Sequence, residues 1–174
     1  MKKVLKVLLL FGACYTLLGH VPEVSAQPSP SRRVSGGGGN FGLGVTLAGP
    51  TGISAKLFLA PQHALQFQLA WLPFYHHGMA FTFDYLWHPA TLVTSSVLNL
   101  VPYVGPGLGI AFWDDRHGTE SGLMLRILGG LAIHWRKVPL DTVLELGWTP
   151  FLVFDNNDFG PAHWDVSIKV RYYF

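Results

Sequence analysis

The sequence has little cysteine, little charge and no long apolar run beyond its first residues. Cys14 is the one cysteine in 174 residues, which excludes a disulfide framework for the rest of the chain. Charged residues make up 13% of the sequence, and from Gln27 onward nine Lys and Arg balance nine Asp and Glu. A near-neutral chain lacks the basic surface that binds nucleic acid, so we expect no nucleic-acid partner. After residue 26 no apolar run approaches the roughly 20 residues of a membrane-spanning helix.

The first 26 residues have the organisation of a secretory signal peptide. A basic start is followed by an apolar run over 4–18, and small residues stand at Val24-Ser25-Ala26. We therefore predict a signal peptide over 1–26, with cleavage after Ala26. The alternative is lipid modification of Cys14, because Phe11-Gly12-Ala13-Cys14 loosely resembles a lipobox.

The remaining chain divides into a tether and a strand-rich domain. Residues 27–40 are rich in Gly, Pro and Ser and predict a flexible tether. From Phe41 onward, segments with alternating apolar residues are separated by turn residues. Eight segments are predicted as strands: 41–47, 52–59, 63–72, 79–91, 100–113, 123–135, 142–148 and 163–174. The predicted connections include 114–122, 136–141 and 149–162.

Alternation places all charge on one face of these strands. In each segment one set of alternate positions carries no charge, as at Phe67, Leu69 and Trp71. The ionisable strand residues occupy the opposite set: Lys56, Asp84, His88, Arg126, His134, Glu145, Asp165, Lys169 and Arg171. A lipid-facing Lys or Arg near mid-bilayer costs about 2–4 kcal/mol, which gives a physical reason for the segregation.

The pattern predicts an eight-stranded antiparallel up-and-down transmembrane β-barrel over 41–174. A soluble sandwich is the alternative, but a barrel whose last strand pairs with its first leaves no backbone edge in lipid. With both termini in the periplasm, tryptophans form two interfacial belts. Those predicted near the outer ends are Trp71, Trp148 and Trp164, and those near the inner ends are Trp87 and Trp135.

A barrel of this size has an interior just wide enough for its own side chains. Inward charges then persist only when they are paired and hydrogen-bonded. We predict a polar network that closes the lumen, formed by Lys56, Asp84, Arg126, Glu145, Asp165, Lys169 and Arg171. Inward glycines at 42, 44, 105, 107 and 109 are expected to make room for bulky neighbours such as Arg126 or Tyr103.

No catalytic residue, metal ligand or cofactor site is predicted. His163, Asp165 and Ser167 supply the residue types of an acyl-transfer triad, but neighbours on one strand face rarely converge, and no Gly-x-Ser-x-Gly elbow is present. Four potential metal ligands lie in one predicted loop: Asp114, Asp115, His117 and Glu120. Loop carboxylates and imidazoles are more often solvated or bridged to lipopolysaccharide.

The end of the sequence alternates strictly and finishes on an aromatic residue. One face of the last predicted strand carries Val166, Ile168, Val170, Tyr172 and Phe174. This pattern resembles the C-terminal β-signal by which outer-membrane barrels are recognised, so the barrel-assembly machinery is an expected partner.

Several motifs resemble a family of small bacterial outer-membrane barrels of unknown function. They are Gly49-Pro50-Thr51-Gly52-Ile53-Ser54-Ala55-Lys56, Asp84-Tyr85-Leu86-Trp87-His88, Pro102-Tyr103 and Arg171-Tyr172-Tyr173-Phe174. The resemblance implies an OmpA-like eight-stranded fold and no particular activity. We expect a monomeric, non-enzymatic barrel in the outer membrane of a Gram-negative-type bacterium, in contact with lipid and lipopolysaccharide. The alternatives are a narrow channel or small hydrophobic-ligand transporter, and a lipid A-modifying enzyme.

Overall fold

The computed structural model describes residues 38–72, 78–115, 118–149, 151–153 and 163–174. The predicted signal peptide and residues 27–37 of the tether lie outside this part of the chain. Eight long strands are present: β1 (Phe41–Ala48), β2 (Thr51–Ala60), β3 (His63–Leu72), β4 (Gly78–Trp87), β6 (Leu98–Asp115), β7 (Gly118–Trp135), β8 (Leu140–Thr149) and β10 (His163–Tyr173). Two short strands, β5 (Val93–Thr94) and β9 (Phe151–Val153), flank them.

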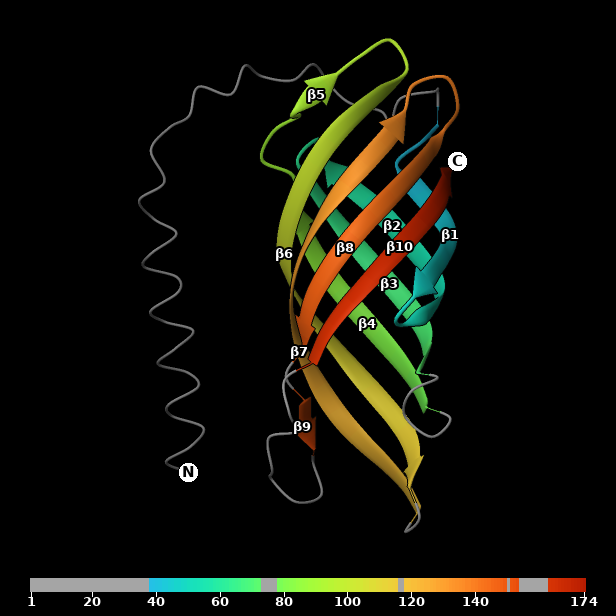
Figure 1. Ribbon diagram of the computed structural model, residues 1–174, viewed down its shortest axis with the longest axis vertical. Helices are drawn as coiled ribbons and strands as arrows, with labels where there is room; N and C mark the ends of the chain where they lie inside the picture. Colours follow the sequence, from blue (N-terminus) through green and yellow to red (C-terminus); the bar gives the residue numbers. More distant parts are fainter. Residues whose placement is uncertain (1–37, 73–77, 116–117, 150, 154–162) are drawn as a thin grey trace, which may run out of the picture. The chain divides into compact units, whose positions relative to one another are not determined.

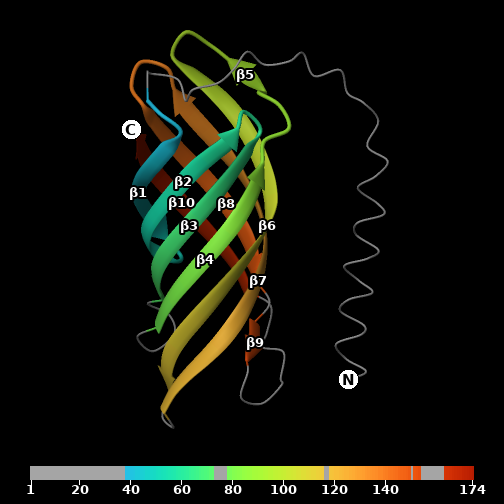
Figure 2. The ribbon, with the colours of Figure 1, turned by 180° about the vertical axis from the view of Figure 1, so that it is seen from behind.

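The long strands form one closed antiparallel barrel (Figure 1). Neighbours in sequence pair with each other, and β1 pairs with β10 from Gly42 opposite Tyr173 to Ala48 opposite Ser167. Figure 2, seen from behind, shows β1 to β4 at the front of the barrel. The predicted eight-stranded antiparallel barrel is confirmed. We call the end where β6 meets β7 the hairpin end, and the end that carries Phe41 and Phe174 the terminal end.

The strand bounds differ from the prediction at both ends of the barrel. β4 stops at Trp87 instead of residue 91, because Pro89 has no N–H to donate to a ladder, and β5 then pairs with β6. The predicted connection 114–122 is mostly strand, since β6 and β7 continue to the pair Asp115 and Gly118. Polar residues there suggested a loop, but a hairpin needs no apolar face to keep its backbone paired. In the predicted connection 149–162, β9 pairs with β7.

The two faces of the wall carry opposite chemistry. Burial alternates strictly along β4, where the inward residues are buried and the outward ones exposed. Many outward positions hold large apolar side chains, such as Val45, Leu108 and Leu144. The described part of the chain has no helix of sufficient length and apolarity to span a membrane. The terminal half of the lumen contains one apolar cluster: Phe58, Ala64, Leu86, Tyr103, Leu128, Ala132, Val143 and Tyr173.

Candidate functional site: the charged network of the lumen

All seven residues of the predicted network lie on the inward face. They come from β2, β4, β7, β8 and β10. Six are at most 3% exposed, and Asp165 keeps 19% of its side chain exposed. The network also contains a residue that the sequence analysis left out, Asp141 at the start of β8, which is fully buried. With Asp141 included, the network among the described residues has four cations and four carboxylates.

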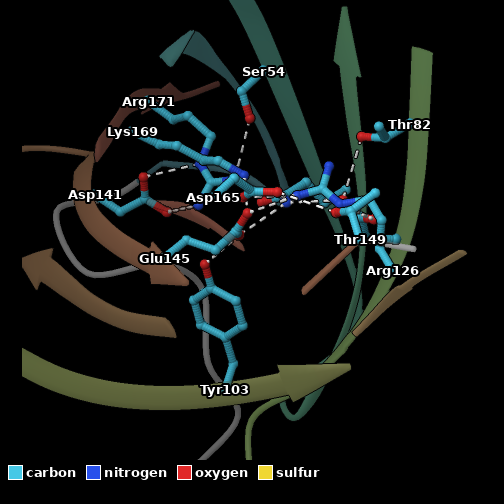
Figure 3. A network of polar contacts seen from close by, with 12 residues as sticks. Ser54, Thr82, Tyr103, Arg126, Asp141, Glu145, Thr149, Asp165, Lys169 and Arg171 are labelled. Carbon is cyan, nitrogen blue, oxygen red and sulfur yellow. Dashed lines mark hydrogen bonds and ion pairs between the residues drawn. The ribbon is translucent and has the colours of Figure 1, made fainter. Parts of the chain in front are cut away.

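Glu145 is the centre of the network (Figure 3). Its Oε1 accepts a hydrogen bond of 2.6 Å from Lys169 Nζ and lies 3.5 Å from Arg126 Nη2. Its Oε2 accepts hydrogen bonds from Tyr103 Oη at 2.6 Å and from Gln66 Nε2 at 3.1 Å. Both carboxylate oxygens are therefore held by donors from four other strands, which locks Glu145 in one position across the lumen.

Gln66 and Arg126 extend the contacts of Glu145 to two further carboxylates. Gln66 Nε2 also donates to Asp84 Oδ2 at 3.1 Å. Arg126 lies 3.9 Å from Asp84 Oδ1 and 3.7 Å from Asp165 Oδ1, and Thr149 donates to the other oxygen of Asp165 at 3.1 Å. The three ion pairs of Arg126 are all longer than an ideal charged hydrogen bond of about 2.7–2.9 Å. The guanidinium therefore balances several charges without a tight bond to one of them.

Arg171 and Asp141 form a second, tighter unit toward the terminal end. Arg171 donates from Nε to Oδ1 and from Nη2 to Oδ2 of Asp141, both at 3.0 Å, which is the bidentate geometry of a strong Arg–carboxylate pair. Tyr173 Oη donates to Oδ2 of the same carboxylate at 2.7 Å. Arg171 Nη1 reaches Gln66 Oε1 at 2.7 Å and joins this unit to the Glu145 centre.

Lys56 has a different environment from the other three cations. Within the described part of the chain no carboxylate forms an ion pair with its ammonium. Its Nζ lies 2.9 Å from His88 Nε2 and 4.6 Å from the centre of the Phe58 ring. His88 Nδ1 is 3.3 Å from the carbonyl oxygen of Gln62, which can only accept, so Nδ1 carries the proton and Nε2 accepts from Lys56.

A glycine lies directly opposite four of the large or charged inward side chains. A Cβ built on each glycine would stand less than 3 Å from the partner side chain, so the partner occupies the space that a larger residue would need. The pairs, each in register on neighbouring strands, are Tyr103 with Gly130, Tyr173 with Gly42, Asp84 with Gly107, and Asp165 with Gly147. Glycines therefore make room for Tyr103, as the sequence predicts, but the glycine beside its ring is Gly130, which is not among the five predicted glycines. Of those five, Gly107 makes room for Asp84.

Tyr173 offers a direct test of the second unit. Replacing Tyr173 with Phe removes its bond to the Asp141 carboxylate and should lower the free energy of unfolding by about 1.5–3 kcal/mol. Tyr172→Phe is the matched control, because that side chain faces outward and is 46% exposed. We expect it to change the stability by less than about 0.5 kcal/mol. Urea unfolding followed by tryptophan fluorescence measures both, and equal effects would contradict the assignment.

Among the described residues, no group of three or more His, Cys, Asp or Glu side chains is arranged to hold a metal ion. Asp165, which sequence analysis considered as a triad member, instead accepts from Thr149 and faces Arg126. The arrangement is one of mutual charge compensation, in which each carboxylate is held by cations, amides or hydroxyls of the wall.

Comparisons with known proteins support the barrel fold and identify no family for this chain. No protein-family model matches the sequence, and no curated protein matches it either. The crystal structure of the N-terminal β-barrel domain of Pseudomonas aeruginosa OprF is similar to this chain, with a TM-score of 0.59 and 17% identity. The likeness covers 77% of this chain and 95% of that one. The chain therefore shares the barrel architecture of that domain, while the motif resemblance to small outer-membrane barrels stays a prediction.

Proposed function

We propose that the protein is an integral outer-membrane barrel with a closed lumen, which contributes to the envelope or presents its hairpins at the surface, without catalysis. The observation that carries this proposal is the inverted polarity of the barrel. In the described part of the chain, the network inside the barrel has four cations and four carboxylates, whereas the outer face exposes large apolar side chains such as Val45, Leu108 and Leu144. A soluble barrel would bury that apolar surface, and lipid is the solvent that stabilises it outside.

The exterior also supports an orientation. Trp71 and Trp164 are exposed near the hairpin end, and Trp87 is exposed near the terminal end. Amphipathic aromatics at two levels are typical of the two membrane interfaces. We place the terminal end in the periplasm and the hairpin end outside.

The last strand supports a role in assembly. β10 pairs with β1 and β8 at once, so it completes the barrel. Its outward residues form the predicted assembly signal: Val166, Ile168, Val170, Tyr172 and Phe174. We propose that the barrel-assembly machinery recognises this strand before β1 and β10 close the wall.

A charge on the exterior tests the membrane assignment. Leu144 is 54% exposed in the middle of β8, and Leu144→Arg should lower the stability of the barrel in lipid vesicles by about 2–4 kcal/mol. Val138→Arg is the control, because Val138 lies in the turn between β7 and β8, at the terminal end, where the cost falls to about 0–1 kcal/mol. Equal effects of the two changes, or a folded protein that stays in solution without detergent, would rule out the assignment.

Because the lumen is closed, we expect the barrel not to conduct ions. Contacts between Glu145 and side chains from β3, β6, β7 and β10 cross the interior. In planar bilayers we expect no steady ionic current from the native protein. Steady openings that Glu145→Ala alters would favour the channel alternative over a structural role.

A further inference from the structure

The residues just before β1 are packed against the terminal end of the barrel. Asn40 continues the pairing of β1 with β2, because its carbonyl oxygen accepts a hydrogen bond of 2.9 Å from Phe58 N. Gly38 is buried beside Tyr173 on β10 and Pro139 in the turn between β7 and β8. Tyr173 N donates to the carbonyl oxygen of Pro139 at 2.8 Å, so these two residues form one surface under Gly38.

Two positions of this segment have no space for a side chain. A Cβ built on Gly38 would stand 2.7 Å from Cβ of Pro139 and 2.8 Å from Cβ of Tyr173. A Cβ built on Gly39 would overlap the main-chain oxygen of Phe174. A side chain at either position would therefore push the segment away from β10. Glycine is required here for a close approach of two backbones, in addition to the flexibility that it gives a tether.

The segment crosses the line along which β1 pairs with β10 and closes the barrel, which we call the seam. In the order of the wall, β2 and β8 are the strands on either side of this pair. The contacts of residues 38–40 begin at β2 and end at the turn before β8. The segment therefore bridges the seam from one flank to the other.

The seam is a short ladder. β1 has eight residues and is the shortest of the eight long strands. It also carries glycines at 42 and 44, and glycine inside a strand weakens it because there is no side chain to pack. β3, by comparison, has ten residues and no glycine. Local opening starts where stabilising contacts are fewest, so we expect the barrel to open first at the seam.

We propose that Gly38, Gly39 and Asn40 form a latch that docks after the barrel has closed and keeps the seam from reopening. These residues are attached to β1, so they reach the end of β10 only once β1 has paired with it. Contacts that form after the folding transition state slow unfolding and leave the folding rate unchanged. The latch lies within the folded barrel, so this inference does not depend on the proposed membrane setting.

Unfolding rates and hydrogen exchange of the refolded full chain in detergent test the latch. Gly38→Val adds a side chain where none fits. Deleting residues 27–39 removes the two glycines of the latch without adding a side chain. Asn40→Ala is the matched control, because the Asn40 side chain is exposed and its bond to β2 uses the main-chain oxygen. Urea jumps give the folding and unfolding rates, and mass spectrometry gives the exchange of each strand.

We expect Gly38→Val and the deletion to unfold at least about fivefold faster than the native chain, as for the loss of contacts worth about one hydrogen bond. Both variants should fold at the native rate. Amides of β1 and β10 should exchange faster in both, while those of β3 and β4 keep their native rates. Asn40→Ala should match the native chain in every measurement.

Several results would overturn the proposal. Slower folding, or a variant that does not fold, would mean that the segment acts before the barrel closes. Exchange that rises equally in β1, β10, β3 and β4 would mean a general loss of stability. Faster unfolding of Gly38→Val without the same effect of the deletion would mean that the added side chain strains the wall. Native unfolding rates in both variants, or an equal effect of Asn40→Ala, would mean that the segment is a tether and no more.

Discussion

Glu145→Ala is expected to lower the free energy of unfolding by about 3–5 kcal/mol, because removing one partner of a buried ion pair leaves an uncompensated charge. The change deprives Lys169 of its 2.6 Å bond and Tyr103 of its acceptor in the same step. Lys169 is fully buried, so its ammonium cannot turn to water without opening the barrel. Urea unfolding of the refolded protein, followed by tryptophan fluorescence, measures the loss.

A double variant distinguishes the loss of the hydrogen bonds of Glu145 from the cost of leaving the buried ammonium of Lys169 unpaired. Glu145→Ala combined with Lys169→Met removes both members of the pair and should recover part of the stability lost in Glu145→Ala. Asp114→Ala is the surface control, because Asp114 accepts from Thr119 at the exposed hairpin and should change stability by less than about 0.5 kcal/mol. A Glu145→Ala barrel as stable as the Asp114→Ala barrel would mean that the network does not hold the lumen together.

The barrel itself could be predicted because lipid and water impose opposite requirements on the two faces of one strand. A period of two is visible in sequence wherever one face must be apolar, as at Phe67 and Leu69 against Gln66 and Gln68. Each strand repeats the pattern independently, so errors in one segment do not spread to the next. Closure between β1 and β10 then follows from the need to pair every edge.

Strand ends and partner choice were less predictable, because they depend on contacts between distant segments. Asp141 lies two residues after Pro139, at the end of the predicted connection 136–141. Extending the alternation of Glu145 and Val143 by one step places it on the inward face. Without Asp141 the predicted network had four cations and three carboxylates. The predicted network therefore had one cation more than carboxylates and lacked Asp141, the bidentate partner of Arg171 that lies 30 residues earlier in the chain.

The alternation of apolar and polar residues also does not predict the register in which neighbouring strands pair. Parity shows that Tyr103 and Gly130 both face inward, but only the register of β6 against β7 shows that they lie directly opposite. The same holds for the ion pairs of Arg126, whose carboxylates come from three different strands. Sequence therefore predicts which residues share the lumen, and the register decides which of them meet.

Gly130→Ala is expected to destabilise the barrel by about 3–5 kcal/mol, an effect out of proportion to one methyl group. The added Cβ would stand 2.4 Å from Cζ of Tyr103 and 2.5 Å from its hydroxyl, so the ring must move. Overpacking of this kind costs about 1–3 kcal/mol. Movement of the ring also breaks the 2.6 Å bond from Tyr103 to Glu145, and a hydrogen bond to a charged group is worth about 1.5–3 kcal/mol.

The neighbouring residue supplies the control for this change. Gly129 lies on the same strand but faces outward, and the nearest atom to a Cβ there is a backbone oxygen at 3.8 Å. Gly129→Ala should therefore leave the unfolding midpoint unchanged or raise it slightly. Tyr103→Leu in combination with Gly130→Ala should be less destabilising than the two single losses added together, because the smaller side chain leaves room for the methyl group. Additive losses, or equal effects at 129 and 130, would show that the ring of Tyr103 does not depend on the space that Gly130 leaves.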